Sequence, residues 1–296
     1  MRILITGGTG FVGAALKQFL LSQGHEVVIL SRSGGDFQWD IAFGYVDPAA
    51  FEGVDAIVHL AGAGIAEERW SAARKRELVN SRVRSTAVLY QALSTIPHSI
   101  KTVISASAIG YYGADTGEVE CVETSPVGLD FLADCTKQWE EAVDQIATLG
   151  IRLAKVRIGL VMGAHGGIFP VISKPIRFGV GANLGSGKQW QSWIHIADLV
   201  RIFNELLINS SLSGVYNGVA PEPVRAGEMN KQIAKALHKP FFLPAIPGFL
   251  LRLVLGEMAC LVLGGSRVSS AKLVKDASFS FTFVRFDEAL KELTHV

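Results

Sequence analysis

The sequence lacks an excess of charge of either sign. Its 296 residues include 28 Lys and Arg against 27 Asp and Glu, so the formal net charge is only +1. Proteins that bind nucleic acid or anionic membranes electrostatically carry clustered basic charge. The charge balance therefore predicts neither a nucleic-acid nor a membrane partner, and we expect a small-molecule substrate.

Cysteine is also scarce. The three cysteines, Cys121, Cys135 and Cys260, are odd in number and show no paired spacing, so the sequence indicates neither a disulfide framework nor a zinc knuckle. The seven histidines are scattered along the chain, so we expect no metal site. This cysteine usage is typical of a reducing compartment, and we expect the cytoplasm.

No stretch is typical of a leader or of a membrane span. The apolar run Ile3 to Thr6 begins almost at once, which leaves no room for a signal peptide. The most hydrophobic stretch, Ile246 to Gly265, contains Arg252 and Glu257 near its middle. Because a charge at the bilayer centre costs about 2.5 to 3.5 kcal/mol, we predict a buried or groove-lining helix there.

What the sequence does contain is an alternation of strands and helices. Continuous apolar runs of strand length are separated by stretches with helical periodicity, which is typical of a parallel sheet covered on both faces. The strands are expected at Ile3–Thr6, Val27–Leu30, Ala56–Leu60, Thr102–Ser105 and Leu153–Ile158, and the helices at Val12–Ser22, Arg69–Leu93 and Phe131–Leu149, the last ending at Gly150. We predict an α/β fold with a doubly wound parallel sheet, the NAD(P)-binding Rossmann fold.

The character of the chain changes after about residue 160. Glycine and proline become frequent, and helices are expected at Ile196–Leu207, Ala226–Leu237, Phe249–Leu263 and Phe286–Leu293. We assign residues 1–160 to the Rossmann core and residues 161–296 to a smaller, mostly helical lobe. This second region also returns strands such as Val215–Val219 to the core, so the boundary is soft.

A glycine-rich turn joins the first strand to the first helix. The stretch "ITGGTGFVG" includes Thr6, Phe11 and Val12 around three spaced glycines, Gly7, Gly10 and Gly13. In this context Gly7 permits a tight turn, Gly10 admits a pyrophosphate and Gly13 allows the helix to pack against the strand. These residues therefore predict a dinucleotide site, because the helix also offers free N–H groups to phosphate.

The end of the second strand indicates which dinucleotide binds. An NAD site places an acidic residue near this point, whereas Ser31 and Arg32 stand here, and an arginine accommodates a 2′-phosphate. We therefore favour NADP(H) over NAD(H). Asp40 lies further on, where it contacts the adenine edge or caps the next turn, and both interpretations stay open.

Four motifs together resemble the extended short-chain dehydrogenase/reductase superfamily. They are "TGGTGFVG", "VHLAG" after the third strand, "SASAIGYYG" after the next and "WIHIADLV" in the second half. More narrowly, "GYYG", "WEEA", "LGSGKQW" and "LVLGGSRV" make the chain similar to epimerase-family proteins of the nucleoside-diphosphate-sugar epimerase type. The similarity spans almost the whole chain, and it implies that Leu60, Ala61, Gly62 and Ser105 also contact the cofactor.

The same resemblance implies a catalytic serine, tyrosine and lysine, the last two in the spacing Y-x-x-x-K. A phenol with a pKa of about 10 needs a nearby cation to ionise at neutral pH. Here the matching helix contains Lys137, but the residue four positions earlier is Ala133. The Tyr-x-x-x-Lys pair is therefore missing, and Lys137 either reaches the cofactor or is an ordinary solvated lysine.

The remaining candidates come from neighbouring elements. Ser107 followed by Tyr111 matches the superfamily's S-x-x-x-Y pattern, so Ser107 is expected to orient a substrate oxygen, with Tyr111 or Tyr112 as the acid. Arg157, at a strand end, binds an anionic group or forms a structural ion pair. Arg82, inside the long helix, approaches the cofactor or faces solvent.

Two functions follow from these patterns. The first is an NADP(H)-binding oxidoreductase or epimerase-like enzyme acting on a small carbonyl or sugar-like substrate. The alternative is a non-catalytic NADP(H)-binding sensor or partner-binding protein that lacks the Tyr-x-x-x-Lys pair. A homodimer is compatible with either.

Overall fold

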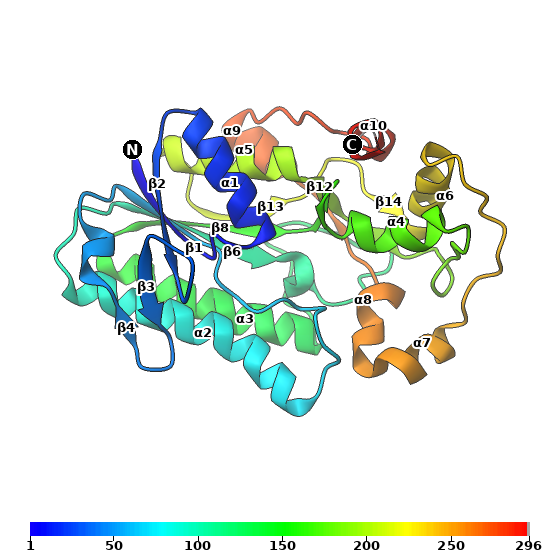
Figure 1. Cartoon of the computed structure of the whole chain (residues 1–296), viewed down its shortest axis with the longest axis horizontal. Helices are drawn as coiled ribbons and strands as arrows, with labels where there is room; N and C mark the ends of the chain where they lie inside the picture. Colours follow the sequence, from blue (N-terminus) through cyan, green and yellow to red (C-terminus); the bar gives the residue numbers. More distant parts are fainter. Residues whose placement is uncertain (295–296) are drawn as a thin grey trace.

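The computed structural model describes residues 1–294 and contains one eight-stranded sheet (Figure 1). The strand order is β13-β8-β6-β5-β1-β2-β3-β4, and all neighbours are parallel except β3 and β4. The strands are β1 Arg2–Thr6, β2 Glu26–Ser31, β3 Phe37–Asp40, β4 Tyr45–Val46, β5 Ala56–His59, β6 Thr102–Ala108, β8 Arg152–Ile158 and β13 Gly214–Gly218. The order runs outward in both directions from β1, which confirms the doubly wound sheet and places the switch point between β1 and β5.

Helices cover both faces of this sheet. Helices α1 (Phe11–Ser22) and α5 (Ile196–Ile208) lie on one face, and α2 (Ala72–Thr95) and α3 (Phe131–Asp144) lie on the other (Figure 1). The central strands are therefore screened from water, and Ile3, Ile57 and Val103 are fully buried. This double cover explains why the strands are continuous apolar runs without polar alternation.

Two predicted helix ends have local causes. Helix α2 begins at Ala72, three residues later than predicted, because the Ser71 side chain caps it by accepting a hydrogen bond from the Arg74 N–H. Helix α3 continues as a 3₁₀ turn, Gln145–Leu149, and Gly150 ends it with a φ of +75°. That left-handed conformation favours glycine, so the predicted end at Gly150 is confirmed.

The second half of the chain adds a mostly helical lobe, as predicted. Helices α4 (Phe169–Arg177), α6 (Ala226–Ala236) and α10 (Phe286–Thr294) share an apolar core that includes Trp193 and Met229. Three small sheets lie outside the eight-stranded sheet: β9 Leu160–Gly163 with β10 Gly166–Gly167 and β12 Trp193–His195, β11 Trp190–Gln191 with β14 Val224–Arg225, and β7 Glu120–Cys121 with β15 Arg267–Val268. Helix α4 was not predicted, because it contains Pro170 and Pro175 and proline disfavours the interior of a helix.

Some of this second region returns to the main core. Strand β13 pairs with β8, helix α5 packs on α1, and helix α9 (Ala271–Ala277) contributes the fully buried Leu273. The strand predicted at Val215–Val219 is thereby confirmed. The division of the chain at residue 160 stays a prediction.

The hydrophobic stretch from Ile246 to Gly265 is not one helix. It forms α7 (Gly248–Leu255), a 3₁₀ turn (Gly256–Ala259) and α8 (Cys260–Leu263), with a φ of +61° at Gly256. A left-handed glycine interrupts the helical path, so the single helix predicted for Phe249–Leu263 was wrong. Within residues 1–294, no helix is both long and apolar enough to cross a bilayer.

Candidate functional site

Glycine is required at two positions of the turn after β1. Gly7 has a φ of +71°, and a Cβ there would lie 2.8 Å from the carbonyl of Leu60. A Cβ on Gly13 would lie 2.3 Å from the Gly7 oxygen. These two glycines therefore let β1, α1 and the loop after β5 approach one another as the sequence predicted.

Gly10 is exposed and is less crowded than Gly7 and Gly13. The nearest atom to a Cβ on Gly10 would be the Gly7 oxygen, at 3.4 Å. Gly10 is the N-cap of α1 and provides no side-chain cap, and the first helical hydrogen bond runs from the Ala14 N–H to the Gly10 carbonyl. The N–H groups of Phe11, Val12 and Gly13 therefore stand at a helix N-terminus that can hold a phosphate.

A polar cleft of about 450 Å³ opens in front of this helix end. We call it the glycine cleft; it is lined by Gly7, Thr9, Gly10, Leu30, Ser31, Arg32, Trp39, Ile41, Leu60–Gly64, Glu67, Arg74, Glu77 and Ser81. Arg32 is exposed, and its side chain has no hydrogen bond or ion pair among residues 1–294. The nearby acid Asp36 accepts a hydrogen bond from the Ile29 N–H and does not line the cleft.

Asp40 has a structural role at the edge of this cleft. Its Oδ1 accepts hydrogen bonds from the N–H groups of Ala42 and Phe43, at 2.8 and 3.1 Å. Of the two interpretations left open by the sequence, the geometry matches the turn cap. The cleft wall is instead formed by the flanking Trp39 and Ile41.

A buried hydrogen-bond chain holds the loop after β5. Thr6 Oγ1 lies 2.7 Å from His59 Nδ1 and accepts a bond from the Ala61 N–H, while His59 Nε2 lies 3.1 Å from Thr86 Oγ1. The Thr86 hydroxyl donates to the Arg82 carbonyl, so it must accept from His59. His59 is therefore a neutral ring with its proton on Nε2, and Thr6 donates to Nδ1.

This chain predicts a pH effect on stability. Burial lowers the pKa of His59 to about 4, against about 6.5 in the unfolded chain. Protonation then favours the unfolded state, so stability is complete above pH 6.5 and falls on acidification, by about 2 kcal/mol between pH 6.5 and pH 5. Urea unfolding at both pH values should show a smaller loss in His59→Asn than in the wild type or in the exposed control His165→Asn. An equal loss in all three would contradict the assignment.

Two further predicted cofactor residues are already engaged. Ser105 is fully buried and donates to the Ala106 carbonyl. Arg82 is neither solvent-facing nor free, because its guanidinium donates to the carbonyls of Leu78 and Ala63 and lies 5.1 Å from the centre of the Trp139 ring. Arg82 therefore fixes the loop that borders the glycine cleft.

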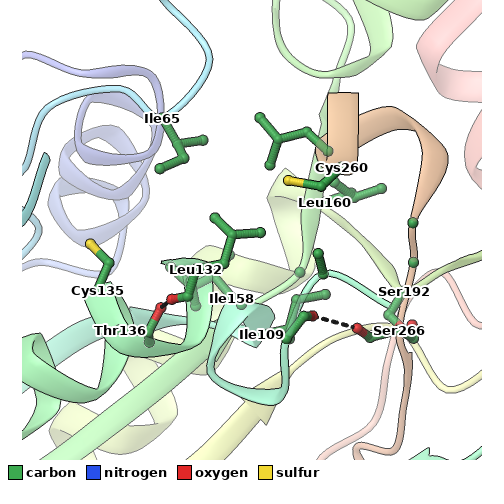
Figure 2. A pocket seen from close by; sticks show the side chains of 18 of the residues that line it. Ile65, Ile109, Leu132, Cys135, Thr136, Ile158, Leu160, Ser192, Cys260 and Ser266 are labelled. Carbon is green, nitrogen blue, oxygen red and sulfur yellow. Dashed lines mark hydrogen bonds between the residues drawn. The ribbon is translucent and has the colours of Figure 1, made fainter. Parts of the chain in front are cut away.

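A second, apolar cavity of about 250 Å³ adjoins the glycine cleft. We call it the apolar chamber; its lining includes Ile65, Arg82, Ile109, Leu132, Cys135, Thr136, Trp139, Ile158, Leu160, Trp190, Ser192, Cys260 and Ser266. Figure 2 shows Leu132, Cys135 and Thr136 together on α3, with Ile65 and Cys260 across the opening. One loop borders both cavities, since Leu60–Gly64 line the cleft and Ile65 lines the chamber.

The predicted catalytic serine lies beside this chamber, in a buried ionic cluster. Ser107 Oγ donates to Glu140 Oε1 at 2.6 Å. The Arg157 guanidinium binds both Glu140 oxygens, at 2.8 and 2.9 Å, and Lys155 Nζ lies 3.4 Å from Oε2. Arg157 thus forms the structural ion pair that was one of its two open interpretations, and Ser107 does not line the chamber.

The two tyrosines belong to the same cluster. The Tyr112 hydroxyl donates to Asn217 Oδ1 at 2.7 Å and accepts a bond from Arg157 at 3.0 Å. Burial raises the pKa of Tyr112 to about 12 despite the opposing effect of Arg157, so this phenol keeps its proton at neutral pH. The Tyr111 ring packs 3.4 Å from the Arg157 guanidinium, and neither tyrosine lines the chamber. A catalytic role for these residues stays a prediction.

Comparison with known proteins identifies the family of this site. The profile of the NAD dependent epimerase/dehydratase family matches residues 3–217, which include the glycine turn and the Ser107 cluster. The chain belongs to this family. A second profile, a domain of unknown function (DUF1731), matches residues 246–293.

Individual members of the epimerase/dehydratase family cover nearly the whole chain. The chain is 37% identical to the epimerase family protein SDR39U1 homolog, chloroplastic, of Arabidopsis thaliana, over 99% of this chain and 86% of the relative. It is 33% identical to epimerase family protein YfhF of Bacillus subtilis, over 99% of this chain and 98% of the relative. The crystal structure of human epimerase family protein SDR39U1 (isoform2) with NADPH superposes with a TM-score of 0.89, at 33% identity and 99% coverage of both chains.

Helix α3 departs from the Tyr-x-x-x-Lys pattern that the resemblance to short-chain dehydrogenases implied for this epimerase-family chain. Ala133 is fully buried, and Lys137 is half-exposed with Nζ 3.7 Å from Glu141 Oε1. Lys137 is therefore the solvated lysine, which was one of its two interpretations. The helix presents Leu132 and Thr136 to the chamber at the same four-residue spacing.

Sequence reasoning missed two charged residues of the site. Arg74 lines the glycine cleft, is 6% exposed and donates to Glu77, Glu67 and the Gly64 carbonyl. Glu140 is the centre of the Ser107 cluster, and in the sequence it is only part of the "WEEA" motif. Both residues lie three or four positions from other inward-facing residues of their helices. That spacing could have indicated that their side chains also face the site.

Proposed function

We propose that this chain binds NADP(H) in the glycine cleft and presents the nicotinamide to a small, uncharged substrate in the apolar chamber. The observation that carries the proposal is the shared loop, which lines the cleft with Leu60–Gly64 and the chamber with Ile65. In a doubly wound sheet, this position at the carboxyl ends of the strands is where dinucleotides bind.

The residues present fit a dinucleotide. The exposed backbone at Gly10 and the N–H groups at the start of α1 suit the pyrophosphate. Arg32, exposed at the end of β2, suits a 2′-phosphate, and the two carboxylates of the cleft wall, Glu67 and Glu77, are paired with Arg74. The NADPH in the human relative, at 33% identity, supports the same preference.

Replacing Arg32 by alanine tests this preference for NADP(H). A charge-assisted hydrogen bond contributes about 1.5 to 3 kcal/mol, so NADPH should bind roughly 10- to 100-fold more weakly, with NADH affinity unchanged. Isothermal titration with both cofactors measures this directly. Arg84→Ala, on α2, serves as the charge-matched control. If the affinities for NADPH and NADH fell together, Arg32 would not read the 2′-phosphate.

The chamber constrains the chemistry. When bound, NADPH would supply a hydride to a substrate carbon, and we assign the accompanying proton to water. Burial raises the pKa of the Cys135 and Cys260 thiols, so both are protonated at neutral pH. The hydroxyls of Thr136, Ser192 and Ser266 donate to the carbonyls of Leu132, Ser266 and Gly113. These side chains therefore position a substrate by contact, and their hydroxyl protons are already donated to backbone carbonyls.

A second candidate function is a non-catalytic NADP(H)-binding sensor. It is favoured by one observation, namely that the α3 positions facing the chamber carry Leu132 and Thr136. Single-turnover absorbance of bound NADPH with a panel of neutral carbonyl compounds separates the two. Oxidation on any of them supports the enzyme, and tight NADPH binding without oxidation supports the sensor.

We also propose a reducing compartment, such as the cytoplasm. Cys121, Cys135 and Cys260 are all free thiols. Fractionation of the native host, followed by detection with an antibody, tests this placement.

A further inference from the structure

A second apolar cavity, of about 190 Å³, lies in the lobe behind the apolar chamber. We call it the second chamber; it is lined from α4, α6 and α8 by residues that include Ile172, Ile176, Met229 and Val262. Leu160, Gln191 and Leu261 line both chambers. The two cavities therefore meet at a common wall, and the site is longer than the part beside the nicotinamide.

Charge is nearly missing from this combined site. No Lys, Arg, Asp or Glu of the described chain lines the second chamber, and Arg82 alone lines the first. The Arg82 guanidinium is already bound to two backbone carbonyls. Burying an unpaired charge is costly, so the two chambers suit an uncharged ligand and disfavour a phosphorylated one.

One polar group in the second chamber is incompletely satisfied. Gln189 lines the chamber and is 9% exposed, and its Nε2 donates to the carbonyls of Leu184 and Val262 at 3.1 and 2.8 Å. Its Oε1 is buried and accepts no hydrogen bond from residues 1–294. Buried acceptors normally have a partner, so this oxygen is available to a donor on a ligand.

We propose that the second chamber binds the apolar tail of an elongated, uncharged substrate, with a hydroxyl or N–H of that tail donating to Gln189 Oε1. The other end of the molecule lies in the apolar chamber. The proposal rests on the proposed function for its reactive end, and it names the substrate class as neutral and largely aliphatic or alicyclic.

A chain-length series tests the proposal. Straight-chain 1-alkanols from butanol to decanol are titrated calorimetrically into the protein, with and without saturating NADPH. Each added methylene should tighten binding about fourfold until the chambers are full. Alkyl methyl ethers of matched length, which lack the donor, should bind about fivefold more weakly. Affinities that do not change with length, or equal affinities for alcohols and ethers, would overturn the proposal.

A cavity-filling variant locates the binding. Ala182 lines the second chamber, so Ala182→Phe should weaken octanol binding at least tenfold and shorten the preferred chain. Ala147→Phe, at an exposed position of the 3₁₀ turn after α3, should leave it unchanged. Unaltered octanol binding in a folded Ala182→Phe protein would place the ligand elsewhere. Thermal unfolding of both variants reports folding.

The same titrations keep the two proposals distinguishable. NADPH affinity is measured separately for the wild type and for each variant. If the wild-type protein did not bind NADPH, the proposed function would be overturned. The alkanol series without NADPH still decides whether the second chamber binds a neutral tail.

Discussion

Gly10→Asp is expected to weaken NADPH binding about a thousandfold while the protein stays folded. A Cβ at Gly10 meets only the Gly7 oxygen, at 3.4 Å, so the side chain fits without collision. Aspartate is a favoured N-cap, and its charge suits the helix N-terminus. The same carboxylate would occupy the place proposed for the pyrophosphate, and like charges in contact cost several kcal/mol.

The controls for Gly10→Asp separate charge from folding. Ala147→Asp adds the same charge on the 3₁₀ turn that precedes the amino end of β8, far from the carboxyl edge, and should bind NADPH normally. Gly7→Ala should instead fail to fold well, because Gly7 has a φ of +71° and its Cβ would lie 2.8 Å from the Leu60 backbone. Calorimetry and thermal unfolding measure both properties. If folded Gly10→Asp bound NADPH as tightly as the wild type, the pyrophosphate would not bind at the start of α1.

Glu140→Gln is expected to cost about 3 kcal/mol of stability. Glu140 is 5% exposed and pairs with Arg157 and Lys155, while also accepting a bond from Ser107. Removing one member of a buried ion pair leaves the other charges uncompensated, which typically costs 3 to 5 kcal/mol. Lys155 Nζ keeps a second ion pair with Asp144 Oδ1, at 2.7 Å. We therefore expect a loss near the lower end of this range. Urea denaturation at neutral pH measures the change.

The neighbouring Glu141→Gln is the matched control for Glu140→Gln. Glu141 is exposed and lies 3.7 Å from Lys137 within the same helix, and such pairs contribute about 0.3 to 0.5 kcal/mol. If Glu140→Gln were no worse than Glu141→Gln, the buried cluster would not stabilise the fold.

Acidification should abolish the advantage of Glu140 over glutamine. Burial alone would raise the pKa of Glu140, but the hydrogen bonds and charge of Arg157, with smaller effects of Ser107 and Lys155, bring it below its usual value. For a lowered carboxyl pKa, the stabilisation is complete above the unfolded pKa and is lost as pH falls through the folded one. The difference between wild type and Glu140→Gln should therefore shrink below about pH 4. A constant difference down to pH 2 would contradict the cluster's ionic nature.

The two halves of the candidate site were unequally accessible to prediction. The glycine turn could be predicted because Gly7 and Gly13 lie in one contiguous stretch, and the local backbone leaves no room for a side chain at either position. The arrangement of the buried cluster could not be predicted, because Ser107, Glu140 and Arg157 come from three separated elements. The sequence does not show which acceptor the Ser107 hydroxyl binds. The tertiary structure shows that it donates to Glu140 Oε1.

The sequence by itself determined the doubly wound sheet, the glycine turn and the missing Tyr-x-x-x-Lys pair. These follow from local periodicity, from backbone conformations open mainly to glycine, and from simple residue identity. The tertiary structure alone decided that Arg157 is bound in an ion pair, that Lys137 faces solvent, and that two apolar chambers meet at Leu160. Burial and partnership set the chemistry of a side chain, and both depend on contacts between residues far apart in the chain.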